Sequence, residues 1–74
     1  MRYTILIKST CPYSIEAVKL MKEKDLDYKV YTAGKDFEVK EFKERYGQSA
    51  TFPRIYRGNM LVGGYDDFMA YFKS

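Results

Sequence analysis

The feature that most constrains the fold is a strand, a helix and a strand that follow one another at the start of the chain. Residues 2–7 are rich in residues that favour strands and become apolar on both faces toward the end, which is typical of a strand buried inside a sheet. Residues 12–24 carry apolar side chains at helical spacing, and residues 28–31 alternate like a second strand. A unit of about thirty residues in this order predicts two parallel strands joined by a right-handed crossover.

The middle of the chain predicts a second helix. Gly34 interrupts the pattern after the second strand, and Asp36 is a candidate N-cap. Phe42 and Tyr46 lie on one face of the helix that would follow. Gly47 comes directly after the last apolar position, where a helix commonly ends.

The last third predicts a hairpin and a short final helix. Residues 54–57 and 60–62 flank a Gly-Asn pair at 58–59, which is the chemistry of a two-residue hairpin turn. Residues 66–67 are two aspartates that open the final helix. The predicted order is therefore βαβαββα, an α/β fold with a small four-stranded mixed sheet and helices on both faces.

The size and cysteine content limit how this fold is held together. A chain of 74 residues with one cysteine and no histidine predicts a single domain over residues 1–74, with no internal disulfide and no cysteine/histidine zinc site. We expect no metal. A lone free thiol suits a reducing, cytoplasmic compartment. No apolar run is long enough to span a bilayer, and the start lacks a signal-peptide pattern, so we expect no membrane association.

The charge pattern argues against nucleic acid as a partner. The net charge of +3 comes from interspersed Lys and Glu rather than from a basic block, and binding to nucleic acid needs clustered Lys and Arg. A mild attraction for small anions remains open.

Cys11 is the candidate reactive group. It lies where the first strand turns into the first helix, among the polar residues Ser9, Thr10, Tyr13 and Ser14. Unpaired N–H groups and the positive end of a helix dipole stabilise a thiolate at such a place. A buried core thiol is the alternative, but polar neighbours at a helix start disfavour it.

Two neighbours of Cys11 affect its chemistry. Lys8 lies three residues earlier, where its ammonium either lowers the thiol pKa, receives a carboxylate, or is simply solvated at a strand end. Ser14 occupies the place of a second cysteine in a Cys-x-x-Cys pair. Because a serine cannot form a disulfide, a dithiol cycle is excluded for this sequence.

Two later segments carry less specific signals. Residues 51–53, Thr-Phe-Pro, are by themselves a loop before a strand. Residues 63–67, Gly-Gly-Tyr-Asp-Asp, are either a turn with a helix cap or a site for an anion at the helix start and for an amine at the aspartates.

Taken together, these motifs resemble the glutaredoxin family across essentially the whole chain. The matching pieces are Lys8, residues 11–14 (Cys-Pro-Tyr-Ser), residues 51–53 and residues 63–67, in the family's order and spacing. The resemblance implies a compact thioredoxin fold, glutathione as co-substrate, and exchange between thiols and disulfides. The partners it implies are glutathione and glutathionylated or disulfide-containing proteins, acted on by a monomer.

The resemblance also implies roles for individual residues. Cys11 would be the nucleophile, Ser14 would stand where dithiol relatives have the resolving cysteine, and Pro53 would follow a cis peptide bond. The residues that would bind glutathione are Lys8, Tyr13, Thr51, Phe52, Pro53, Gly64, Tyr65 and Asp66. Within this set, the backbone of Phe52 would pair with the glutathione cysteine, and residues 64–66 would hold the γ-glutamyl end. Arg45 and Gln48 match less firmly, as groups that could meet the glycyl carboxylate.

Two positions depart from the family's pattern. Ser14 replaces the second cysteine that relatives with Cys-Pro-Tyr usually carry, either naturally or as an engineered replacement. Tyr65 is larger than the small residue often found there, so we expect the edge of the groove to differ in shape from that of relatives.

These observations favour a glutathione-dependent thiol–disulfide oxidoreductase that works by a monothiol route through Cys11. Three alternatives stay open. The first is an iron–sulfur carrier, in which two chains and two glutathiones share a [2Fe–2S] cluster, although Pro12 disfavours it because such relatives usually have glycine there. The second is a dithiol reductant of proteins such as ribonucleotide reductase, if a cysteine at position 14 was replaced. The third is a non-catalytic interaction module.

Overall fold

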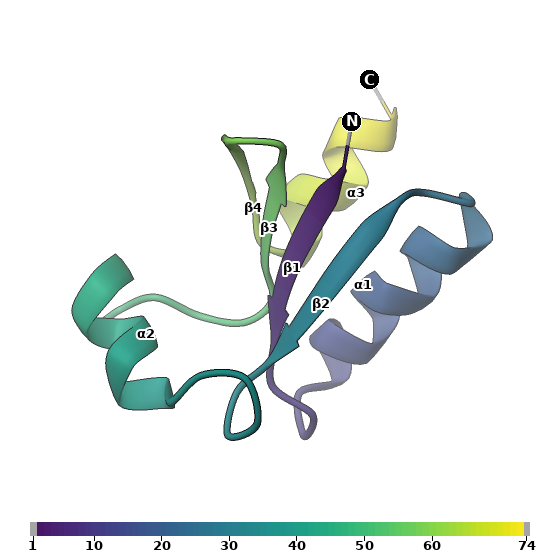
Figure 1. The fold of residues 1–74 in the computed structure, drawn as a ribbon. Helices are drawn as coiled ribbons and strands as arrows, with labels where there is room; N and C mark the ends of the chain where they lie inside the picture. Colours follow the sequence, from purple (N-terminus) through teal and green to yellow (C-terminus); the bar gives the residue numbers. More distant parts are fainter. Residues whose placement is uncertain (1, 74) are drawn as a thin grey trace.

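A computed structural model describes residues 2–73 and shows a four-stranded mixed sheet with three helices (Figure 1). The strand order is β2-β1-β3-β4. β1 pairs in parallel with β2 and antiparallel with β3, and β3 pairs antiparallel with β4. The strands are β1 (Tyr3–Ile7), β2 (Tyr28–Thr32), β3 (Arg54–Arg57) and β4 (Met60–Gly63). The predicted βαβαββα order and mixed sheet are confirmed.

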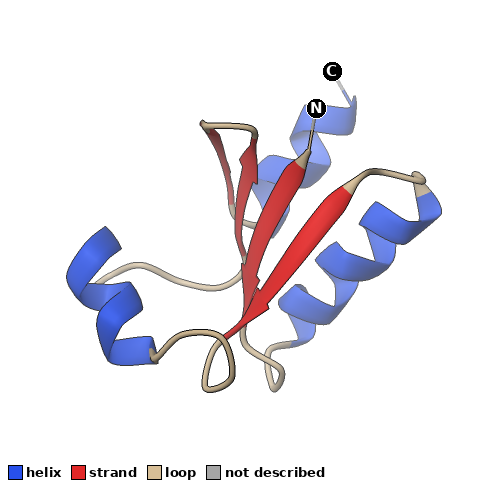
Figure 2. Cartoon of the chain, in the orientation of Figure 1, coloured by secondary structure: helices blue, strands red, loops and turns tan. Residues whose placement is uncertain are grey.

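The helices are α1 (Pro12–Glu23), α2 (Val39–Tyr46) and α3 (Tyr65–Lys73) (Figure 2). α1 and α3 lie together behind the sheet, and α2 lies toward its other face, near the start of β3, where Tyr46 contacts Arg54 and Tyr56 (Figure 1). The helices therefore lie on both faces of the sheet, as predicted. None of the helices within residues 2–73 is both long enough and apolar enough to cross a membrane.

The core lies between the sheet and the pair α1 and α3. Side chains alternate along a strand, so Tyr3 and Ile5 of β1 and Ile55 of β3 all point to this side and are buried. They pack against Ala17 and Met21 of α1 and Phe68 of α3. Each large apolar side chain buried in this way contributes about 1.5–3 kcal/mol to stability. This layer fixes the start of α1 relative to the sheet.

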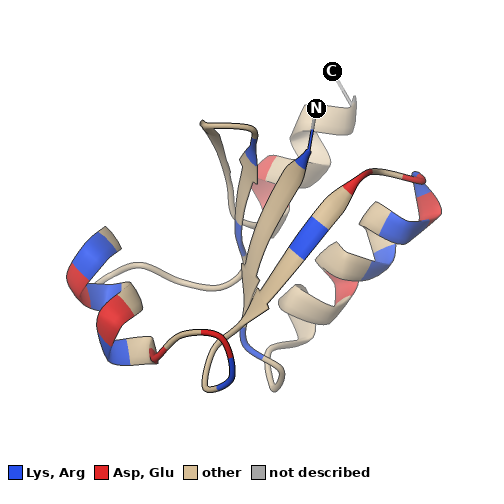
Figure 3. Cartoon of the chain, viewed as in Figure 1, with Lys and Arg blue, Asp and Glu red and all other residues tan. Residues whose placement is uncertain are grey.

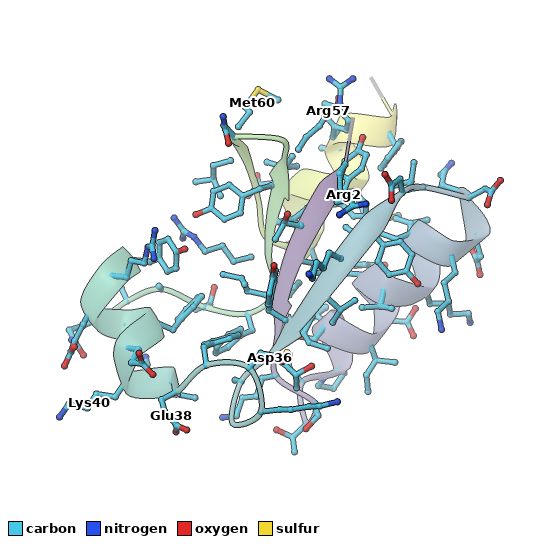
Figure 4. The ribbon with its side chains drawn as sticks, viewed as in Figure 1. Arg2, Asp36, Glu38, Lys40, Arg57 and Met60 are labelled. Carbon is cyan, nitrogen blue, oxygen red and sulfur yellow. The ribbon has the colours of Figure 1, made fainter. Side chains whose placement is uncertain are left out.

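The link between β2 and α2 shows that the predicted N-cap of the second helix was wrong. Asp36 is not the N-cap of α2; its Oδ2 accepts a hydrogen bond from the backbone N–H of Thr32 at 2.8 Å. Glu38 is the N-cap and forms a reciprocal capping box with Glu41. Figure 4 shows Asp36 in the turn after β2 and Glu38 at the start of α2. The short carboxylate therefore stabilises the turn, and the helix begins two residues later.

Gly47 ends α2 at φ 107°, as predicted from the sequence. A positive φ of this kind is open to glycine and strained for other residues. The chain then leaves α2 and returns to the sheet through residues 48–53.

Candidate active site

Cys11 lies in the turn between β1 and α1 and is half-buried. It is the N-cap of α1, with an extended backbone (φ −90°, ψ 118°), and Pro12 occupies the first helical position. The backbone N–H of Cys11 donates to the carbonyl of Lys8 at 2.9 Å, which closes the turn. No side chain caps the helix, so the first-turn N–H groups remain available to an anion.

These surroundings lower the pKa of the Cys11 thiol. Burial acts in the opposite direction and raises the pKa, but the backbone N–H and hydroxyl of Ser14, the backbone N–H of Tyr13 and the charge of Lys8 together outweigh it. All of these groups stabilise the thiolate over the thiol. The arrangement therefore favours the thiolate, which is the nucleophilic form of the sulfur.

Ser14 is fully buried, with 0% of its surface exposed. Its Oγ accepts a hydrogen bond from the backbone N–H of Lys8 at 3.3 Å. A hydroxyl can accept and donate at once, so Ser14 can hold the Lys8 turn while donating its proton to the Cys11 sulfur. The residue is part of the site's framework rather than an exposed first-turn serine.

The loop of residues 51–53 lies beside the cysteine. The Phe52–Pro53 peptide bond is cis, as the family resemblance implies. The Sγ of Cys11 lies 3.8 Å from the carbonyl oxygen of Phe52. The ring of Phe52 stacks on the buried ring of Phe42 from α2, with centroids 4.3 Å apart. α2 therefore supports the loop that faces the sulfur.

A groove of about 320 Å³ borders this loop on the α3 side. Tyr13 and Tyr65 form its rim, with ring centroids 5.6 Å apart and 36° between the planes. The groove is lined by Tyr13, Thr51, Phe52, Pro53, Gly64, Tyr65, Asp66 and Asp67. Seven of these eight residues belong to the set that the family resemblance implies for glutathione, and Asp67 is the addition. The fold thus brings together three segments that are distant in the sequence.

The start of α3 forms one wall of this groove. The Oδ2 of Asp67 accepts a hydrogen bond from the N–H of Gly64 at 3.3 Å, and the carbonyl of Gly64 accepts the N–H of Phe68 at 3.0 Å. Asp67 therefore closes the turn, while Asp66 is exposed and lines the groove. A helix start is suited to an anion, and an exposed carboxylate is suited to an amine.

A second hollow, of about 410 Å³, lies on the other side of Cys11. It is lined by Lys8, Thr10, Cys11, Val39, Lys43, Ala50, Thr51 and Phe52. Lys8 and Lys43 supply two cations, and the Nζ of Lys43 also donates to the carbonyl of Gln48 at 3.1 Å. Thr51 and Phe52 border both hollows, so the two hollows are neighbours on either side of this loop.

Lys43 lines this hollow although the sequence patterns did not point to it. Arg45, which the family resemblance matches less firmly, lines a separate hollow with Glu41, Phe42 and Tyr46. The available signal was helical position, because Lys43 directly follows the buried Phe42 and is itself half-buried, whereas Arg45 is exposed. Gln48 contributes its backbone carbonyl to this side of the site.

Among the described residues there is one thiol, that of Cys11, and there is no group of three His, Cys, Asp or Glu side chains placed to hold a metal ion. A thiol with a lowered pKa that lines a surface hollow can attack a disulfide, so thiol exchange is a reaction open to Cys11.

Comparison with known proteins agrees with this chemistry. The sequence model of the family described as Glutaredoxin matches residues 3–62. The chain is 38% identical over 69 residues to glutaredoxin 1 of Rickettsia prowazekii, covering 88% of this chain and 73% of that protein. The solution structure of glutaredoxin from Brucella melitensis aligns with a TM-score of 0.78 at 29% identity, over 99% of this chain and 79% of that one.

A further solved structure shows the same fold at lower identity. Glutaredoxin 1 from Francisella tularensis, crystallised with cacodylate, aligns with a TM-score of 0.84 at 19% identity. The alignment covers 97% of this chain and 92% of that chain. The similarity therefore extends over nearly the whole length of both chains.

Proposed function

Because the chain belongs to the glutaredoxin family and is a thiol–disulfide oxidoreductase, we propose that glutathione is its co-substrate and that it removes glutathione from proteins by a monothiol route. The observation that carries the proposal is the position of Cys11, whose pKa is lowered at the start of α1 and whose Sγ lies 3.8 Å from the carbonyl oxygen of Phe52.

The proposed reaction has two exchange steps. In the first, the Cys11 thiolate attacks the glutathione sulfur of a protein–glutathione mixed disulfide. A bond forms between Cys11 and that sulfur, the original disulfide breaks, and the protein thiolate leaves and takes a proton from water. In the second, the thiolate of another glutathione attacks the glutathione sulfur held by Cys11. Oxidised glutathione leaves, and the Cys11 thiolate is restored.

The lowered pKa supports the first step, because only the thiolate is nucleophilic and an ordinary thiol is a few per cent ionised at neutral pH. It supports the second step as well, since a thiolate of lower pKa is a better leaving group. The groups of Ser14 and Lys8 that lower the Cys11 pKa would therefore favour both exchange steps.

The groove supports glutathione as the molecule that is held. We place the γ-glutamyl carboxylate at the start of α3, near Gly64 and Tyr65, and its ammonium near Asp66. The glutathione cysteine would pair with the backbone of Phe52, beside Pro53, as a neighbouring strand does. Thr51 would border this segment, and Tyr13 with Tyr65 would form the rim.

The glycyl carboxylate would then enter the second hollow. We assign Lys8 and Lys43 to it, because both line that hollow with Cys11. A tripeptide held at both ends presents its sulfur to Cys11 in a fixed orientation, which accelerates exchange by reducing the loss of freedom in the transition state.

Ser14 supports the monothiol route. It is buried against the turn of Lys8 and cannot displace glutathione from Cys11. We therefore infer that release depends on a second glutathione. One chain is enough for this cycle, and a reducing, cytoplasmic setting would keep glutathione in supply.

The test is a rate measurement on a glutathionylated peptide with glutathione as reductant. We expect turnover by the original protein and none by Cys11→Ser, with Ser9→Ala as a matched control in the same turn. Equal rates for the original protein and Cys11→Ser would refute the proposal. Mass spectrometry after incubation with oxidised glutathione should find one glutathione on Cys11, removed by added glutathione.

A second variant separates the monothiol route from a dithiol route. Ser14→Cys places a second thiol at the buried position three residues after Cys11. We expect this variant to lose two hydrogen masses on oxidation and to reduce a peptide disulfide. The original protein should instead accumulate the mixed disulfide with glutathione. Release from the original protein at a rate independent of glutathione concentration would contradict the monothiol route.

A further inference from the structure

Within residues 2–73, helices cover only a small part of one face of the sheet. The strand residues that point away from α1 and α3 form two rows across β2, β1 and β3. The first row is Lys29, Thr4 and Tyr56, and the second is Tyr31, Leu6 and Arg54. We call these six residues the open face.

α2 covers only one corner of the open face. Tyr46 is the α2 residue whose ring contacts the open face, at Arg54 and Tyr56, among the ring contacts of the described residues. Figure 1 shows no helix in front of β1 and β2 within residues 2–73. Lys29 is exposed, while Thr4, Leu6 and Tyr31 are half-exposed. The β1–β2 half of the face is therefore accessible.

The charged side chains of the open face are all positive. The four described strands contain Lys29, Arg54 and Arg57 and no Asp or Glu (Figure 3). The carboxylates at the two ends of β2 already have partners: Asp27 lies 3.5 Å from the Nε of Arg2, and Asp36 accepts the N–H of Thr32. The two cations of the face are thus not neutralised by the strands around them.

The two cations are held along the sheet by tyrosines. The Nζ of Lys29 lies 5.5 Å from the centre of the Tyr31 ring. The guanidinium carbon of Arg54 lies 4.2 Å from the centre of the Tyr46 ring, and its Nε donates to the hydroxyl of Tyr56 at 2.9 Å. Cation–ring contacts of this kind orient a charged group without neutralising it. Two positive groups therefore lie at opposite corners of an aromatic and aliphatic surface.

We propose that the open face binds an extended acidic segment of a partner protein. Lys29 and Arg54 are two strands and two residues apart, which is about 12 Å given the usual spacings of a sheet. In an extended chain, residues four positions apart point the same way and lie about 13 Å from each other. Two carboxylates at that spacing would meet both cations, and an apolar side chain between them would lie over Leu6.

The observations favour this occupant over two others. A second copy of this chain would bring a basic face against a basic face, and like charges oppose association. A nucleic acid would gain contact with only two cations, whereas specific affinity usually comes from several phosphate contacts. The rings of Tyr31 and Tyr46 are also already covered by Lys29 and Arg54, which leaves less ring surface for stacking bases.

The proposed docking is independent of thiol chemistry, although the two sites are adjacent. Arg54 directly follows Pro53, which lines the groove beside Cys11. A partner on the open face would thus lie next to the groove. Binding to the face can be measured on the reduced protein without any exchange reaction, so its failure would not affect the proposed function.

The test is an NMR titration of the labelled protein with a synthetic extended peptide of about twelve residues. Its glutamates are four positions apart, leucines lie midway between them, and serines fill the other positions. A second peptide has glutamine in place of each glutamate. We expect saturable shifts of the amides of β1, β2 and β3 with the acidic peptide, and binding weaker by about tenfold, or about 1.4 kcal/mol, with the glutamine peptide.

Matched variants locate the site. Lys29→Gln with Arg54→Gln should weaken binding about tenfold, which corresponds to two exposed ion pairs. Lys19→Gln with Lys22→Gln removes the same charge from α1 and should leave binding unchanged. Lys29→Gln alone changes only an exposed side chain and should weaken peptide binding about threefold. This single variant tests the site even if the double variant unfolds.

Three outcomes would overturn the proposal. The first is equal weakening by the α1 pair, which would show attraction to net charge alone. The second is tighter binding of a thymidine oligonucleotide to the same amides, which would identify nucleic acid as the occupant. The third is shifts of these amides with protein concentration in the absence of peptide, which would identify a second copy.

Discussion

The sulfur of Cys11 lies 3.8 Å from the carbonyl oxygen of Phe52, although 41 positions separate the two residues. The contact joins the start of α1 to the loop that ends in cis Pro53. A peptide that pairs with the backbone of Phe52 would carry its own side chain past the sulfur. Under the proposed function, strand pairing and nucleophilic attack therefore take place at one point.

Lys8→Gln should raise the pKa of Cys11, because it removes one of the groups that lower it. The thiolate persists above the Cys11 pKa and is lost as the pH falls through it. The variant should therefore react more slowly with iodoacetamide near neutral pH and reach the original rate at higher pH. Alkylation rates measured across pH check this.

Lys22→Gln is the matched control for Lys8, since it removes the same charge from the last turn of α1. Its alkylation profile should coincide with that of the original protein. Added salt should reduce the difference between Lys8→Gln and the original protein, because Lys8 is exposed and its charge is screened. Unchanged profiles for both variants would show that Lys8 does not act on the sulfur.

Ser14→Ala should destabilise the protein and also raise the pKa of Cys11. The change leaves the N–H of Lys8 without its acceptor in a part-buried turn, which costs about 1–3 kcal/mol. It also removes a hydroxyl that favours the thiolate. Urea unfolding measures the first effect, and the alkylation profile measures the second.

Ser9→Ala is the control for Ser14→Ala, because Ser9 is exposed in the same turn. A change within about 0.5 kcal/mol is expected for it. If Ser14→Ala has full stability and an unchanged profile, the buried hydroxyl has no role in the turn or at the sulfur.

The β elements and the first helix could be predicted from the sequence because their signals are local. The apolar run of β1, the alternation in β2 and the Gly-Asn turn at 58–59 depend on neighbouring residues only. Asp36 failed as a cap for a local reason too, since its short side chain can serve either a turn or a helix start. In this structure the Asp36 carboxylate accepts the N–H of Thr32 and so stabilises the turn.

The site itself combines segments whose contacts depend on the whole fold. The position of Lys43 beside Cys11 requires α2 to be anchored by the stacking of Phe42 on Phe52, which no local pattern predicts. The contact of Tyr13 with Tyr65 likewise depends on how α1 and α3 pack. The resemblance to a family supplied most groove residues, but it pointed to Arg45 rather than to Lys43.

Gly63→Ala and Gly64→Ala should have different effects although the two residues are adjacent. Gly63 has φ 124°, and an added Cβ would lie 2.7 Å from the Cβ and Cγ of Asp67. Strain of this kind costs about 1–3 kcal/mol before the clash is counted. An added Cβ at Gly64 meets only the Pro53 carbonyl, at 3.6 Å, which is an ordinary contact.

We therefore expect Gly63→Ala to lower the unfolding midpoint, while Gly64→Ala keeps its stability and raises KM for glutathione because a methyl group enters the groove. Thermal unfolding and steady-state kinetics separate these effects. A stable Gly64→Ala protein with unchanged KM would argue against glutathione at the start of α3.

Lys43→Gln should weaken the use of glutathione more than Arg45→Gln does. Both changes remove one positive charge from α2, but Lys43 lines the hollow that contains Cys11 and Lys8, and Arg45 lines a different one. A charge-assisted hydrogen bond to a carboxylate is worth about 1.5–3 kcal/mol when formed, and exposure of the site reduces this toward the low end. We expect KM for glutathione to rise about tenfold for Lys43→Gln and to stay near the original value for Arg45→Gln.

Lys43→Arg serves as the rescue variant, because the Nζ of Lys43 also donates to the carbonyl of Gln48. The arginine keeps the charge and the donor and should recover most of the affinity for glutathione. Equal effects of Lys43→Gln and Arg45→Gln would mean that α2 attracts glutathione only through its overall charge.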